Sequence, residues 1–77
     1  MLQAYILVTV GMGDGVAAVT SLRNIEGVRF AELVTGPYDI VVDIEASDVD
    51  VLGKLIQESV QKVPGVVRTI TCPVFHL

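Results

Sequence analysis

The sequence predicts an α+β fold with the element order β-α-β-β-α-β, in which a four-stranded antiparallel sheet carries two helices on one face. Three observations support this prediction. The 77 residues suffice for one small domain only. Strand-like alternation and helix-like spacing follow each other twice along the chain. A Gly-Val step precedes a strand in each half, at Gly27 and at Gly65, about half the chain apart.

The first half opens with a strand predicted over residues 2–10, because alternate side chains there form one apolar face. This face should lie under the helices and consists of Leu2, Ala4, Ile6, Val8 and Val10. The run GMGDG at residues 11–15 ends the strand, and Asp14 is expected to cap a helix that extends to about Asn24. A second strand is expected from Val28 to Thr35.

The second half repeats this order from Tyr38 onward. Its first strand alternates in the same way, and its apolar face consists of Ile40, Val42 and Ile44. Ser47 is expected to cap the second helix as part of a capping box with Asp50. Apolar residues recur at helical spacing until Pro64-Gly65 ends that helix, and they are Val49, Leu52, Ile56, Val60 and Val63. The last strand is expected from Val66 to about Phe75.

Right-handed crossovers would bring both helices onto one face of the sheet, which makes the expected architecture a ferredoxin-like sandwich. The other face then has no cover within the chain. We assign to this face Tyr5, Leu7, Thr9, Val41, Thr69 and Thr71, with Asp39 at a strand end. Half of these side chains are apolar, and the expected cover is a second copy of the chain.

Composition supports self-association and narrows the range of partners. Hydrophobic residues make up 52% of the chain and the mean hydropathy is +0.67, more than so small a monomer can bury. Charges and glycines interrupt every apolar run, and no basic leader is present, so we expect neither membrane insertion nor secretion. The net charge of −4 disfavours direct contact with nucleic acid. A single cysteine fits a cytoplasmic protein.

Catalytic and metal-binding residues are not apparent in the sequence. His76 is the penultimate residue, and Cys72 lies in a predicted strand where we expect it to be buried. One histidine and one cysteine do not make a recognisable metal-ligand set, and no cofactor is indicated. A row of carboxylates could bind a cation, but a solvated or interface row is favoured: Asp39, Asp43 and Glu45. The glycines at 11–15 lack the Lys-Ser/Thr of a phosphate loop, which favours a simple turn.

The run GPYD at residues 36–39 has two interpretations. Gly36 and Pro37 suffice for a turn between strands. Asp39 is not needed for the turn and could accept hydrogen bonds from an ammonium group, while free N–H groups near Gly36 could meet a carboxylate. The alternative is that Asp39 caps its own turn. From chemistry alone, an amino-acid site and a simple turn are equally supported.

The motifs GxYD at residues 36–39 and PGVxRTxT at residues 64–71 resemble the ligand-binding (RAM) domain of Lrp/AsnC-type transcription regulators. The resemblance extends from Ala4 to Phe75. It implies a non-enzymatic domain that dimerises through its sheet, often assembles further into octamers, and binds an amino-acid effector between dimers. The ligand-binding residues it implies are Leu33, Val34, Thr35, Gly36, Tyr38, Asp39, Thr69 and Thr71.

Two features depart from the family pattern. Pro37 replaces a commoner polar residue and removes a backbone N–H donor from the loop. The chain also begins almost at its first strand, so we expect residues 1–77 to form a stand-alone effector-binding domain without the family's helix-turn-helix. Such a domain would act by co-assembly with a full-length regulator or through another partner.

Three other functions are alternatives to this resemblance: a different regulatory domain, an enzyme and a structural element. An ACT-like regulatory domain has the same strand order, and the run GMGDG partly fits its first turn. A small dimeric ferredoxin-like enzyme would need a convergent histidine or acid in the sheet cleft, and we find no such set. A purely structural assembly element would need neither Asp39 nor the paired threonines.

Overall fold

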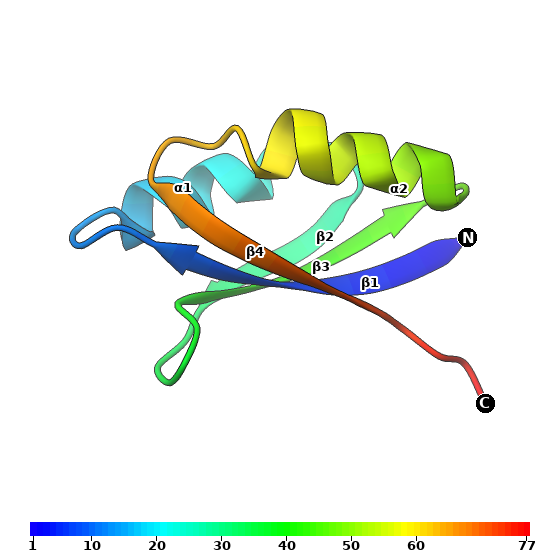
Figure 1. Cartoon of the computed structure of the whole chain (residues 1–77), viewed down its shortest axis with the longest axis horizontal. Coiled ribbons are helices and arrows are strands. Elements are labelled where there is room, and N and C mark those ends of the chain that lie inside the picture. Colours follow the sequence, from blue (N-terminus) through cyan, green and yellow to red (C-terminus); the bar gives the residue numbers. More distant parts are fainter.

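The computed structural model describes all 77 residues, as one sheet with two helices on one face (Figure 1). The elements are β1 (Leu2–Val10), α1 (Gly15–Arg23), β2 (Val28–Leu33), β3 (Ile40–Ala46), α2 (Val49–Leu55) with its π-helical continuation η1 (Ile56–Val60), and β4 (Val66–Pro73). The strand order is β2-β3-β1-β4 and all neighbours are antiparallel. The predicted ferredoxin-like order is therefore confirmed. Neither helix is long and apolar enough to span a bilayer.

The core lies between the sheet and the helices, where the predicted apolar faces of the two central strands meet. Six side chains from these strands have no exposed surface: Ala4, Ile6, Val8, Ile40, Val42 and Ile44. The register places Ile6 opposite Val42 and Val8 opposite Ile40. Full burial of such a side chain contributes about 1.5–3 kcal/mol. A slip of one residue would turn this whole set to the other face, so the core determines the register.

Gly27 and Gly65 occupy equivalent positions before β2 and β4, as the internal repeat predicts. Their φ angles are +95° and +93°, in the region that L residues with a side chain rarely adopt. A Cβ added at Gly27 would lie 2.7 Å from the carbonyl oxygen of Glu45, and one added at Gly65 would lie 2.7 Å from Cβ of Asp14. Both backbone conformation and space therefore require glycine.

The two helix N-termini differ from the sequence prediction. Asp14 is at the N-cap of α1, but its side chain accepts no hydrogen bond from the helix. The cap of α2 is Asp48 rather than Ser47, and its carboxylate accepts a hydrogen bond from the Val51 N–H at 2.9 Å. Asp48 has the extended backbone of an N-cap, and its charge also suits the positive end of the helix.

Strands β2, β3 and β4 are shorter than the alternation alone predicted. β2 ends at Leu33 instead of Thr35 and β3 begins at Ile40, because the connecting loop occupies residues 34–39. β4 ends at Pro73 instead of Phe75, although the Val74 N–H still donates to the Gln3 carbonyl at 2.9 Å. The second helix stops being α-helical at Leu55, which its apolar spacing did not indicate.

The uncovered face of the sheet, which we call the open face, differs from the prediction in β4. Thr69 is paired with Val8 and Thr71 with Ile6, so both threonines lie on the helix side. Their assignment to the open face was wrong, because β4 carries polar residues on both faces and its alternation does not identify the buried one. The β4 residues on the open face are Arg68, Ile70 and Cys72.

Replacing Gly27 by alanine should destabilise the protein by about 1–3 kcal/mol, because the backbone is left-handed there and the new Cβ meets the Glu45 carbonyl. Gly53→Ala is the matched control. Gly53 lies within α2 with open space around its Cα, so this change should stabilise the protein by about 0.5–1 kcal/mol. Urea unfolding of both variants measures the difference, and an equal effect at the two glycines would contradict the assignment.

The position of the α2 cap predicts that substitutions at Asp48 and at Ser47 differ in their effect on stability. Asp48→Ala should lower the free energy of unfolding by about 0.5–2 kcal/mol, because the Val51 N–H loses its acceptor. Ser47→Ala should change it little, since the N-cap is Asp48 and the Asp48 carboxylate is the acceptor for the helix. Thermal or urea unfolding measures both variants. A larger loss of stability for Ser47→Ala than for Asp48→Ala would instead identify Ser47 as the cap, as the sequence predicted.

Candidate functional site

The predicted effector loop connects β2 to β3 and projects past the sheet on the side away from the helices (Figure 1). The Val34 N–H donates to the Asp39 carbonyl at 2.9 Å and closes the hairpin. The tip at Thr35, Gly36 and Pro37 is exposed, and Tyr38 is half-buried. Gly36 has a φ of +136° with open space beside it. The tip thus presents its backbone to solvent.

Asp39 ties the base of this loop to β1. Its N–H donates to the Val8 carbonyl, and its Oδ2 accepts from the Val10 N–H, both at 2.9 Å. The carboxylate thus continues the ladder where the pairing of β1 with β3 ends, instead of capping its own turn. The second carboxylate oxygen, Oδ1, has no hydrogen-bond partner. Asp39 is half-buried, so this oxygen is an acceptor that a ligand can use.

Leu33 and Val34 lie just before the tip of the loop. Both are apolar but exposed, at 48% and 40%. The Leu33 Cδ2 atom lies 3.1 Å from the position that a Cβ on Gly15 would take. Leu33 therefore packs over the first residue of α1, and a side chain at Gly15 would be in tight contact with it. The register pairs Leu33 with the buried Ile40, so Leu33 lies on the helix side of the sheet.

The two threonines lie on the opposite side of β1 from Asp39. Thr69 is paired with Val8, the residue whose carbonyl accepts the Asp39 N–H. Asp39 and Thr69 are therefore at the same end of the sheet, two strand spacings or about 10 Å apart. Thr71 follows two residues further along β4 and is exposed although it is on the helix side, since β4 is an edge strand.

The loop tip and the threonines do not share one pocket within the chain. The threonines are on the helix side of the sheet, and the hairpin extends past the opposite face (Figure 1). Asp39, at the base of the hairpin, is the predicted loop residue that stays near Thr69. The structure places Asp39 and Thr69 at one end of the sheet, about 10 Å apart across β1, and keeps the loop tip apart from both threonines.

Gln61 is a polar residue beside Thr69 that the sequence reasoning missed. Its Nε2 donates to the Thr69 Oγ1 at 3.1 Å. The two residues border a hollow of about 380 Å³ that is also lined by Val66, Val67 and Arg68. No sequence pattern indicated this contact, because a continuous α-helix was expected where η1 forms. A larger hollow of about 480 Å³, between Gly27 and Leu55, contains none of the predicted site residues.

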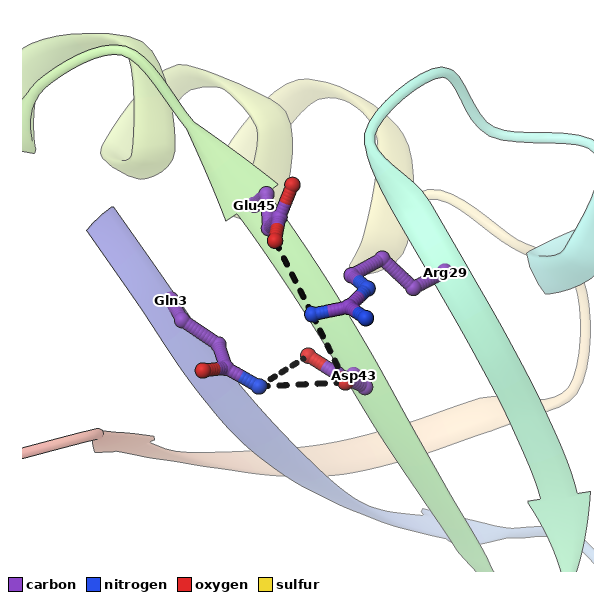
Figure 2. A network of polar contacts seen from close by, with 4 residues as sticks. All are labelled: Gln3, Arg29, Asp43 and Glu45. Carbon is purple, nitrogen blue, oxygen red and sulfur yellow. Dashed lines mark hydrogen bonds and ion pairs between the residues drawn. The ribbon is translucent and has the colours of Figure 1, made fainter. Parts of the chain in front are cut away.

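Two carboxylates of the predicted acidic row, Asp43 and Glu45, form a polar network with Gln3 and Arg29 (Figure 2). Gln3 Nε2 donates to both oxygens of Asp43, at 3.0 and 3.1 Å. Arg29 lies 3.9 Å from Asp43 and 3.0 Å from Glu45. Asp43 is buried although no helix covers it. The Arg29 guanidinium supplies the positive charge of this row, and no cluster of metal-ligating side chains is present.

The two side chains considered for catalysis lie apart from the site. Cys72 is exposed on the open face, opposite Tyr5, and not buried as expected. The expectation was wrong because β4 is an edge strand and no second layer covers this face. His76 is exposed beyond the end of β4. The polar groups near Thr69 and Asp39 are donors and acceptors suited to binding a ligand.

A family model supports the resemblance seen in the motifs. The model described as the Lrp/AsnC ligand binding domain matches residues 3–76. No protein with curated annotation matches significantly.

Solved structures agree with the fold. TTHA0845 from Thermus thermophilus superposes with a TM-score of 0.93 at 27% identity, over 100% of this chain and 96% of that one. AsnC of E. coli has a TM-score of 0.92 at 21% identity, over 99% of this chain and 52% of its own. The transcriptional regulator NMB0573 of Neisseria meningitidis, solved as an L-Met complex, has a TM-score of 0.87 at 21% identity, over 97% and 50%.

The chain thus corresponds to nearly all of one neighbour and to about half the length of the two regulators. At 21% identity the regulators establish the fold alone. The family model covers nearly the whole chain and includes both motifs. The chain therefore belongs to the Lrp/AsnC ligand-binding domain family.

Proposed function

We propose that this chain is an amino-acid-sensing module that works as an oligomer in the cytosol, without catalytic activity of its own. The observation that supports this proposal most directly is the placement of Asp39. One of its carboxylate oxygens positions the loop through Val10, and the other is free at the end of the sheet where Thr69 also lies. The Lrp/AsnC ligand-binding fold and the L-Met complex of NMB0573 favour an amino acid as the ligand.

The groups around the loop match the two ends of an amino acid. The free oxygen of Asp39 would accept a hydrogen bond from the α-ammonium group, and such charge-assisted bonds are about twice as strong as neutral ones. Exposed backbone N–H groups near Gly36 would bind the α-carboxylate. Pro37 contributes no N–H to this set. The hydroxyls of Thr69 and Thr71 would orient the effector from the last strand.

The effector would be shared between two copies of the chain. The tip of the loop lies past the open face, and the threonines lie on the helix side. A ligand that touches the tip and the threonines together therefore takes these groups from different subunits. Binding of an amino acid would then depend on assembly, and larger rings such as octamers would follow from such shared sites.

The open face would be the dimer interface. Leu7 and Val41 are neighbours on its two central strands, and Leu7 is also opposite Ile70. Tyr5 and Phe30 are more than a third exposed, and their rings are 6.4 Å apart. Contiguous apolar surface of this kind is uncommon on soluble monomers. In the polar network, Asp43 and Glu45 share the one guanidinium of Arg29, and Gln3 donates to Asp43, so each carboxylate has a partner within the chain when a second copy covers it.

The route to gene regulation would be co-assembly with a DNA-binding member of the same family. The net charge of −4 makes this chain a poor partner for a phosphate backbone. A related subunit would supply the DNA contacts, and this chain would make its assembly responsive to an amino acid.

Asp39→Asn tests the sensing role. The asparagine side chain can still accept from the Val10 N–H, but it lacks the charge that an ammonium group needs. We expect ligand-free stability close to wild type and about tenfold weaker binding of the preferred amino acid, equivalent to about 1.4 kcal/mol. Calorimetry and thermal shift with the twenty amino acids measure both quantities.

Two further variants complete this test. Asp50→Asn removes an exposed carboxylate in α2 and should leave binding unchanged. Asp39→Ala should lose stability as well as affinity, because the Val10 N–H loses its acceptor. Wild-type affinity in Asp39→Asn would rule out Asp39 as the ammonium site, and the absence of any amino-acid binding to wild type would refute the sensing role.

Leu7→Arg tests the dimer interface. A charge at the centre of the open face should prevent its burial, so the variant should be monomeric where the wild type is at least dimeric. Light scattering at micromolar concentration measures the mass, and circular dichroism checks that the variant is folded. Val16→Arg on the outer face of α1, where Val16 is 70% exposed, should keep the wild-type mass. A monomeric wild type would contradict the interface.

A further inference from the structure

The helix after β3 changes its hydrogen-bonding pattern before it ends. In η1 the Gln61 N–H donates to the carbonyl of Ile56 at 2.8 Å, the bond of a π-helix. The core-facing residues of this segment follow ordinary α-helical spacing: Leu52, Ile56, Val60 and Val63. The π-turn lies in the middle of this set, between Leu52 and Val63, so the residues that follow it include the buried Val63 as well as the exposed Gln61.

Gln61 is the residue that directly follows the π-turn. One extra residue in a turn rotates every later side chain by about 100° relative to a continuous α-helix. In this rotated position the Gln61 amide reaches across to β4 and donates to the Thr69 hydroxyl at 3.1 Å. π-turns of this kind occur frequently at functional sites. Gln61 is therefore positioned at the one threonine that lies at the same end of the sheet as Asp39.

The hollow between η1 and β4 offers uncharged hydrogen-bonding groups. Gln61 Oε1 has no donor, and the Thr69 hydroxyl uses its oxygen as the acceptor for Gln61, which leaves its proton available. The hollow of about 380 Å³ has space for a small side chain. Arg68 also borders it but is paired with Thr9, an open-face residue, so its side chain leaves toward the other face.

We propose that Gln61 determines the specificity of the effector site, and that it selects amino acids whose uncharged side chain both donates and accepts hydrogen bonds, as carboxamides and hydroxyls do. This inference rests on the proposed function, in which Asp39 binds the ammonium group and the threonines meet the rest of the effector. An apolar side chain would leave the Gln61 oxygen and the Thr69 proton unpaired. A cationic side chain would find no opposite charge, because no acidic residue lines the hollow, and an anionic one would meet only Arg68, whose register directs its side chain toward the open face.

The test compares amino-acid selectivity in three proteins by calorimetry: wild type, Gln61→Leu and Gln57→Leu. Gln57 is the matched control, since it is also exposed, lies in η1 and makes no side-chain hydrogen bond. We expect the wild type and Gln57→Leu to bind asparagine, glutamine, serine or threonine at least tenfold more tightly than leucine or methionine. Gln61→Leu should lose this preference by tenfold or more while keeping its ligand-free melting temperature, because Gln61 is exposed.

The outcomes separate this inference from the proposed function. If Gln61→Leu ranks the amino acids as the wild type does, Gln61 has no role in selection and sensing through Asp39 still stands. If the wild type prefers apolar or charged amino acids, the selected class is wrong. If the wild type binds no amino acid at all, the sensing role fails, and the role of Gln61 fails with it.

Discussion

The register of β1 between its two neighbours is the constraint on which the rest of the structure depends. Ala4, Ile6 and Val8 are fully buried on one face and pair with β3 on one side and β4 on the other. A slip of one residue would expose all three, so the core permits one alignment only. The same alignment places the start of β3 and the start of β4 at one end of the sheet, where the proposed site lies.

Functional groups at that end are positioned by the strand ladder itself. Asp39 accepts from the Val10 N–H and donates to the Val8 carbonyl, so its carboxylate is oriented by the backbone of β1. Thr69 is set opposite Val8 from the other side, and its hydroxyl is engaged by Gln61. A site built on hydrogen-bonded strands in this way is more rigid than one carried by a free loop. The loop tip alone remains exposed to meet a partner or a ligand.

The sequence predicted most of the fold because its patterns are redundant. The apolar alternation of β1 and β3, and the two glycines with positive φ, each indicate the same order of elements. The prediction failed where two local choices are nearly equivalent. Ser47 and Asp48 are both competent caps, and the two faces of β4 are similarly polar, so tertiary register and backbone conformation decide between them.

In the candidate site, too, some features follow from the sequence and others only from the tertiary structure. The sequence alone determined that Gly36 to Asp39 form a turn with a carboxylate that the turn does not need, and that threonines recur near the end of the chain. Only the tertiary structure decided that this carboxylate bonds to Val10, that Thr69 faces the helices, and that Gln61, at the end of a π-turn, donates to Thr69. The physical reason is that side-chain type is local, whereas strand register and helix phase depend on contacts across the whole chain.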